Sequence, residues 1–152
     1  MALVGKLIGY TELRSGGKVI HDLLRHQPHD LASICPGKVH SCDLLSGRLG
    51  AVGSTIIWQF THEGKKQTAK EIIQEIDESN HKIVFKIVGG EIVEEIYKAF
   101  TISFHSETID GKEMGVWTME FERPNTSVPY PTSLMDYACT LLKDMDDHNT
   151  RK

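Results

Sequence analysis

The chain has 152 residues, of which 39% are hydrophobic and 25% are charged, so its composition is that of a globular protein and excludes a disordered chain. We expect one domain spanning residues 1–152, because this length lies near the most frequent domain size. Lys and Arg total 17 against 21 Asp and Glu, which gives a net charge of −4. This balance lacks the basic character of a nucleic-acid-binding protein, and we expect no nucleic-acid partner.

The apolar runs and the cysteines predict a cytoplasmic protein. The first ten residues, MALVGKLIGY, have only about three apolar residues in a row, which does not match a signal peptide. No apolar run approaches the roughly 18–20 residues of a membrane span. Cys35, Cys42 and Cys139 form neither a CxxC nor a zinc pattern, so we expect reduced thiols.

The first third of the chain predicts two strands with two short helices between them. The strands are expected at Leu3–Leu13 and Val39–Leu45. One helix is expected at Lys18–Leu24, after a Ser-Gly-Gly turn. The second helix is expected at His29–Ile34, and Pro28 opens this segment. Proline is compatible with a first helical turn, where its missing N–H is not needed.

Residues from about 53 to about 123 predict an antiparallel meander of five strands. Apolar residues recur at every second position, which is typical of strands with one buried face. The alternating sets are Ile56, Trp58 and Phe60; Ile83, Phe85 and Ile87; Phe100, Ile102 and Phe104; and Trp117, Met119 and Phe121. Turn signals separate the strands, and they are Glu63-Gly64, Ser79-Asn80, Gly89-Gly90 and Asp110-Gly111. Such dipeptides between alternating runs favour hairpins.

The end of the chain predicts a long amphipathic helix. Thr132 or Ser133 can cap it, and it is expected to end near His148. One apolar face recurs at spacings of three and four, and its members are Leu134, Ala138, Leu141, Leu142 and Met145. Three carboxylates, those of Asp144, Asp146 and Asp147, oppose the helix dipole, so we expect this end to fray. The whole pattern indicates an α+β fold in which a bent sheet wraps around the helix.

No strong catalytic or metal-binding motif is present. His62 and Glu63 lack the second histidine of HExxH, and the eight histidines are scattered, so we expect no metal site. Gly47, Gly50 and Gly53 are spaced by three, which matches neither a dinucleotide fingerprint nor a P-loop. A tight turn with a bulge is the simpler interpretation, and a loop that approaches a ligand at the rim of a site is the alternative.

The aromatic faces of the predicted strands also have two interpretations. They can fill a solid core, or they can line a ligand pocket, because such pockets are mostly apolar with a few polar groups. Periodicity alone does not separate a filled core from a hollow one.

Short segments that follow one another along the whole chain form a recognisable pattern. They are Leu3-Val4-Gly5-Lys6-Leu7, Gly53-Ser54 before Ile56-Ile57-Trp58, Gly64-Lys65-Lys66 before Ala69-Lys70-Glu71-Ile72-Ile73, Asp77-Glu78, Tyr97-Lys98-Ala99-Phe100, Trp117-Thr118-Met119-Glu120-Phe121-Glu122 and Lys143-Asp144-Met145-Asp146-Asp147-His148. This pattern resembles the plant major latex protein-like subfamily. That subfamily belongs with the birch-pollen allergen Bet v I and the intracellular pathogenesis-related proteins, which are START-like.

The resemblance implies a helix-grip fold with an internal cavity. In this fold, a curved seven-stranded antiparallel sheet grips a long C-terminal helix, and two short helices after the first strand form a V. The residues then expected to line the cavity are Leu23, Trp58, Phe60, Ile83, Phe85, Phe100, Ile102, Trp117, Met119, Leu134, Ala138, Leu141 and Met145. A phosphate-binding role is sometimes suggested for the glycine-rich loop of this family. Here Arg48-Leu49 stands where relatives often have an acidic and an aromatic residue, so the sequence does not strengthen that suggestion.

Two functions follow from the resemblance. The first is binding of hydrophobic or amphipathic small molecules, such as specialised metabolites, sterols or hormones, in connection with defence or stress. The alternative is a cofactor-free enzyme that cyclises or isomerises a reactive iridoid or alkaloid precursor in the same cavity. Its candidate acid–base residues are His26, Lys70, Tyr97, Glu120 and Tyr137. We expect no cofactor and a monomer or weak dimer.

Overall fold

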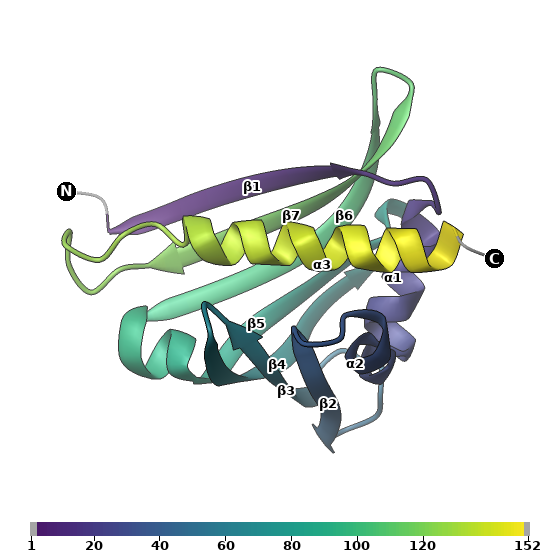
Figure 1. Cartoon of the computed structure of the whole chain (residues 1–152). Helices are drawn as coiled ribbons and strands as arrows, with labels where there is room; N and C mark the ends of the chain where they lie inside the picture. Colours follow the sequence, from purple (N-terminus) through teal and green to yellow (C-terminus); the bar gives the residue numbers. More distant parts are fainter. Residues whose placement is uncertain (1–2, 151–152) are drawn as a thin grey trace.

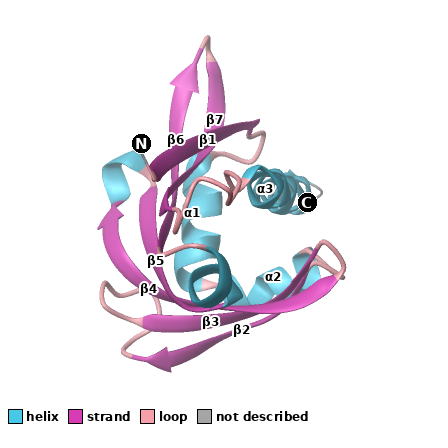
Figure 2. Ribbon diagram, turned by 90° about the vertical axis from the view of Figure 1, so that its left-hand side faces the viewer, coloured by secondary structure: helices cyan, strands magenta, loops and turns pink. Residues whose placement is uncertain are grey.

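The computed structural model describes residues 3–150 and shows a seven-stranded antiparallel sheet that curls around a long helix (Figures 1 and 2). The strands lie in the order β1-β7-β6-β5-β4-β3-β2. Their bounds are β1 (Val4–Glu12), β2 (Val39–Ser46), β3 (Thr55–His62), β4 (Lys65–Asp77), β5 (Lys82–Gly90), β6 (Ala99–Ile109) and β7 (Lys112–Glu122). The helices are α1 (Gly17–His26), α2 (Leu31–Ile34) and α3 (Thr132–Thr150), with single turns at η1 (Pro28–Asp30), η2 (Glu78–Asn80) and η3 (Ile92–Ile96). The expected α+β helix-grip fold is confirmed.

Two of the predicted hairpin turns have the backbone geometry that their sequences favour. Glu63 and Gly64, between β3 and β4, have φ angles of 55° and 74°. Asp110 and Gly111, between β6 and β7, have φ angles of 51° and 78°. Two successive positive φ angles match the twist of the flanking strands, and Asp-Gly is a preferred pair for such a turn.

The connection between β5 and β6 differs from the expected Gly-Gly hairpin. Gly90 ends β5, and the chain then makes one turn of π-helix, η3, before β6 begins. A Cβ atom on Gly90 would lie 1.8 Å from the carbonyl oxygen of Thr68, so the glycine permits close contact with β4. The side chain of Glu91 then accepts a hydrogen bond from the Thr68 amide at 2.8 Å, which fixes the turn against the sheet.

Helix α3 lies close to β1 and β7, at one side of the curved sheet (Figure 1). Glycines in these strands make the approach possible. A Cβ atom on Gly9 would lie 2.7 Å from the sulfur of Met135, and one on Gly115 would lie 2.9 Å from Leu142. Larger side chains at these two positions would push the helix away from the sheet.

The C-terminal end of α3 does not fray, contrary to the expectation from its carboxylates. The helix continues to Thr150, because other parts of the chain satisfy the acids. Asp146 is buried and accepts hydrogen bonds from the amides of Arg14 and Ser15 at 3.0 and 2.8 Å and from the Ser15 hydroxyl at 2.5 Å. Burial alone would raise the pKa of Asp146, but these hydrogen bonds outweigh it and hold the pKa below its usual range.

Replacing Asp146 by alanine should destabilise the protein by about 3 kcal/mol, because the amides of Arg14 and Ser15 in the β1–α1 turn would lose a charged acceptor. The matched control is Asp147→Ala, since Asp147 pairs with Arg14 at the surface. Its loss should cost less than about 1 kcal/mol. The measurement is the free energy of unfolding in urea at pH 7. Equal effects of the two variants would contradict this account of the helix end.

Candidate functional site

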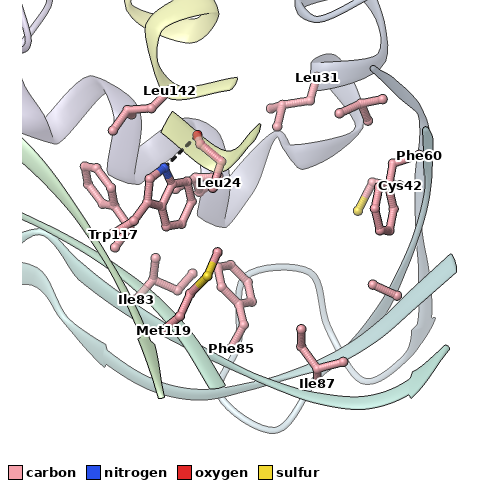
Figure 3. Packing of buried hydrophobic residues seen from close by; sticks show 14 of the residues in the cluster. Leu24, Leu31, Cys42, Phe60, Ile83, Phe85, Ile87, Trp117, Met119 and Leu142 are labelled. Atoms are coloured by element: carbon pink, nitrogen blue, oxygen red, sulfur yellow. Dashed lines mark hydrogen bonds between the residues drawn. The ribbon is translucent and has the colours of Figure 1, made fainter. Parts of the chain in front are cut away.

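A cavity of about 110 Å³ lies between the concave face of the sheet and α3. Its walls come from the sheet, from α1 and α2, and from the inner face of α3. The lining residues are Leu24, Leu31, Val39, Trp58, Phe60, Ala69, Glu71, Phe85, Ile87, Ile92, Phe100, Ile102, Trp117, Met119, Leu134, Tyr137, Ala138, Leu141 and Met145. Figure 3 shows several of these side chains converging from the two layers, among them Phe85 and Met119 from the sheet and Leu24 and Leu31 from the helices.

Most of the residues expected to line a cavity are placed there by the structure. They are Trp58, Phe60, Phe85, Phe100, Ile102, Trp117, Met119, Leu134, Ala138, Leu141 and Met145. Among them, Phe100, Ile102, Trp117 and Met119 share one face of β6 and β7, whose pairing runs without a register shift from Ala99 to Ile109.

Two of the expected lining residues lie elsewhere in the core. Leu23 is buried, but the phase of α1 turns its neighbour Leu24 toward the cavity instead. Ile83 shares the parity of Phe85 but lies two residues nearer to the start of β5, opposite Phe104 and fully buried beyond the cavity. Both side chains are therefore buried without lining the cavity.

Four of the five candidate acid–base residues lie outside the cavity lining. Lys70 and Glu120 point to the outer face of the sheet, because each follows a buried residue by one position in its strand. His26 is exposed at the end of α1. Tyr97 is buried, and its hydroxyl donates a hydrogen bond to the carbonyl of Pro129 at 2.8 Å.

Tyr137 is the candidate that does line the cavity. Its hydroxyl donates to the carbonyl of Lys38 at 2.7 Å, and burial raises its pKa well above the usual range. The indole of Trp117 similarly donates to the carbonyl of Ala138 at 2.9 Å (Figure 3). These polar atoms of the walls are thus satisfied by the protein backbone, and the surface that they leave to the cavity is apolar.

Sequence reasoning missed several lining residues, and one of them, Glu71, carries a charge. The others are Leu24, Leu31, Val39, Ala69, Ile87 and Ile92. Ala69, Glu71 and Ile73 are buried on one face of β4, whereas Lys70 between them is exposed. Ala69 and Ile73 lie two positions before and after Glu71, so strand alternation puts Glu71 on the same inward face, and this is the signal that the sequence offers.

Glu71 is the one acidic or basic side chain among the lining residues that the structure describes. It is 7% exposed, and its carboxylate accepts a hydrogen bond from the indole nitrogen of Trp58 at 2.8 Å. Burial raises the pKa of Glu71 to about 7, and the hydrogen bond from Trp58 offsets only part of this effect. The cavity therefore contains a carboxyl group that changes charge near neutral pH.

The glycine-rich loop forms a turn between β2 and β3 and does not contribute to the lining. Gly47, Gly50 and Gly53 all have positive φ, and none of them is a lining residue. Gly50 is buried against α1, where Arg25 donates a hydrogen bond from Nε to its carbonyl at 2.9 Å. The simpler interpretation, a tight turn, describes this geometry.

The family of the chain follows from comparison with known proteins. Residues 2–151 match the model of the pathogenesis-related protein Bet v 1 family. The chain belongs to this family. Within it, MLP-like protein 43 of Arabidopsis thaliana is 31% identical over 97% of this chain and 94% of that protein. MLP-like protein 34 of the same plant is 32% identical, but the chain spans only 44% of its length.

Solved structures support the same Bet v 1 fold. The crystal structure of ginseng major latex-like protein 151 from Panax ginseng superposes with a TM-score of 0.92 at 36% identity, over 97% of this chain and 99% of that one. A norcoclaurine synthase point mutant from Thalictrum, in complex with a transition-state analogue, has a TM-score of 0.75 at 13% identity, which shows a shared fold alone.

Within residues 3–150, no group of three or more His, Cys, Asp or Glu side chains is arranged to hold a metal ion. No helix in that same range combines the length and the apolar character needed to cross a membrane.

The raised pKa of Glu71 makes stability depend on pH with a defined sign. Below pH 4.5, its ordinary value, the carboxyl is protonated in both the folded and the unfolded chain. Between pH 4.5 and about 7 the unfolded chain releases this proton while the folded chain retains it, so stability falls as pH rises. Above pH 7 the penalty is complete, at about 3 kcal/mol.

Glu71→Gln should therefore stabilise the protein at pH 8 by up to about 3 kcal/mol and change little at pH 4, because glutamine stays neutral and still accepts the bond from Trp58. The measurement is urea unfolding of both proteins across this range. Burial lowers the pKa of His21, so its protonation destabilises both proteins equally toward acid. The difference between their free energies of unfolding therefore reports on Glu71 alone. A stability difference that is constant with pH would refute the assignment.

Proposed function

We propose that the protein binds an apolar or amphipathic small molecule in the cavity between the sheet and α3. The observation that carries this proposal is a wall of apolar side chains around an internal space. Water is a poor occupant of such a space, since an ordered water needs two to four polar partners. Burial of an apolar ligand contributes about 25 cal/mol per Å² before the costs of association, so micromolar affinity is the natural expectation.

Family membership supports the same proposal and extends it. The name of the matched family, pathogenesis-related, supports a role in plant defence. The thiols of Cys35, Cys42 and Cys139 are free, which supports a reducing compartment such as the cytoplasm. We therefore propose a cytoplasmic carrier or sequestering protein for a plant metabolite.

Ala69→Phe should block this binding, because Ala69 is a small, buried lining residue and a phenyl ring there would fill the cavity. The probe is N-phenyl-1-naphthylamine, a neutral dye whose fluorescence rises in apolar surroundings. We expect its dissociation constant to increase at least about tenfold. The control is Ala99→Phe at an exposed position of β6, and this variant should bind the dye like the wild type. A folded Ala69→Phe protein that binds the dye with unchanged affinity would place the ligand elsewhere.

Catalysis in the same cavity is a second candidate, which the titration of Glu71 favours. A carboxyl with a pKa of about 7 is well matched to proton transfer near neutral pH. Such a group contributes about 10²–10⁴-fold to the rate when it is held next to the reacting atom.

If the protein isomerises or cyclises a reactive carbonyl compound, Glu71→Gln should abolish turnover while it retains binding, because glutamine cannot exchange a proton. The measurement is product formation from a panel of iridoid dialdehydes and alkaloid precursors, followed by chromatography. Turnover that survives in Glu71→Gln would exclude Glu71 as the acid–base group. Binding with no turnover of any compound in the wild type would leave the carrier function as the conclusion.

A further inference from the structure

Glu71 lies in the middle of the curved sheet, where its strand neighbours are apolar. In the pairing of β4 with β3 it stands opposite Ile56, and in the pairing with β5 it stands opposite Ile87. Lining residues on α1 and α2 are Leu24 and Leu31, which carry no charge. The carboxyl group is therefore surrounded by hydrocarbon on the strands beside it and on the helices that close the cavity.

The protein supplies this carboxyl with few partners. Among residues 3–150, the one hydrogen bond that Glu71 receives comes from the indole of Trp58, and no Lys, Arg or His forms an ion pair with it. An ionised carboxylate has about four acceptor positions. A buried carboxylate with a single neutral donor is costly, and a further donor would stabilise it.

The indole that holds Glu71 belongs to the cavity itself. Trp58 and Glu71 are both lining residues on the adjacent strands β3 and β4. The bond between them fixes one carboxylate oxygen, so the group has a defined position against any molecule in the cavity. The rest of the wall offers such a molecule only hydrocarbon and aromatic surfaces.

We propose that Glu71, oriented by Trp58, is the specificity-determining group of the cavity, and that it selects apolar ligands with a hydrogen-bond-donating head group, either a hydroxyl or an ammonium. This inference rests on the proposed binding function and names the ligand chemistry for it. A ligand with a carboxylate head is disfavoured, since it brings a second negative charge and no donor.

The pH dependence separates the two kinds of head group. An ammonium requires the ionised form of Glu71, so its binding strengthens as pH rises past 7. Two other titratable groups lie near the site, the thiol of Cys42 on β2 and the phenol of Tyr137 on α3, and burial raises the pKa of both well above the usual range. His62 on β3 contacts the ring of Tyr137 but is not a lining residue.

The test uses four probes with one naphthalene body, namely 2-methylnaphthalene, 2-naphthalenemethanol, 2-naphthylmethylamine and 2-naphthoate. Each probe displaces N-phenyl-1-naphthylamine from the wild type, from Glu71→Gln and Glu71→Leu, and from the control Glu120→Gln, whose carboxylate is exposed on β7. At pH 8 we expect the alcohol and the amine to bind the wild type about tenfold more tightly than methylnaphthalene, and the naphthoate to bind most weakly.

In Glu71→Leu both preferences should disappear while methylnaphthalene still binds, and Glu120→Gln should behave like the wild type. Glu71→Gln should lose the preference for the amine and keep part of that for the alcohol, because its amide oxygen still accepts. Amine affinity should rise roughly tenfold from pH 6 to pH 8 in the wild type and stay constant in Glu71→Gln.

The outcomes distinguish the two levels of the proposal. Two results would show that Glu71 does not determine specificity. In the first, the alcohol and the amine bind the wild type no better than methylnaphthalene does; in the second, Glu71→Leu still binds the alcohol and the amine more tightly than methylnaphthalene. The proposed binding function would stand in both cases. If no probe binds and the dye itself fails to bind, the proposed function is wrong. A preference for the amine alone identifies a cationic ligand, and a preference for both head groups identifies hydrogen bonding as the shared requirement.

Discussion

The structure depends on one constraint, which is that α3 packs most closely against one side of a curved sheet, at β1 and β7. Gly9 and Gly115 let the helix approach β1 and β7, and Asp146 fixes its far end to the turn after β1. The sheet then continues to curl away through β6 to β2, as Figure 2 shows. A straight helix cannot follow this curvature, so a space remains between its inner face and the central strands. The cavity thus results from where the helix is anchored.

A hollow of this kind is costly, because apolar side chains that face a void lose dispersion contacts. The chain keeps the hollow open with hydrogen bonds at the two flanks of α3. Trp117 donates to the carbonyl of Ala138, and Tyr137 donates to the carbonyl of Lys38. Both donors are lining residues, so the groups that shape the wall also hold the helix at its height above the sheet. A collapse of the cavity would break these two hydrogen bonds, and the one from Trp117, which is buried, is expensive to leave unmade.

Local pattern was enough to predict the sheet and most of the wall, because period-two alternation reports burial wherever strands pair without bulges. It failed where the decisive partner is distant in sequence. The hydrogen bonds of Asp146 come from Arg14 and Ser15, at the other end of the chain. Glu71 was missed because a carboxylate interrupts the apolar alternation by which an inner face is recognised, and the pairing of β4 with β5 shifts register beside it. Residue type makes Lys70 a candidate, but its place between buried Ala69 and Glu71 points its side chain to the outer face of β4.

The protein has two costly features in the same place, an apolar cavity and a buried carboxyl that accepts one hydrogen bond, from Trp58, among the residues that the structure describes. One molecule with an apolar body and a donating head corrects both, and the resulting stabilisation grows with its concentration relative to its dissociation constant. The pKa of Glu71, raised to about 7, makes this exchange inexpensive near neutral pH. Without a donor the group can remain protonated at little cost, and it ionises when a donor arrives. Selectivity and stability then reside in the same few atoms of β3 and β4.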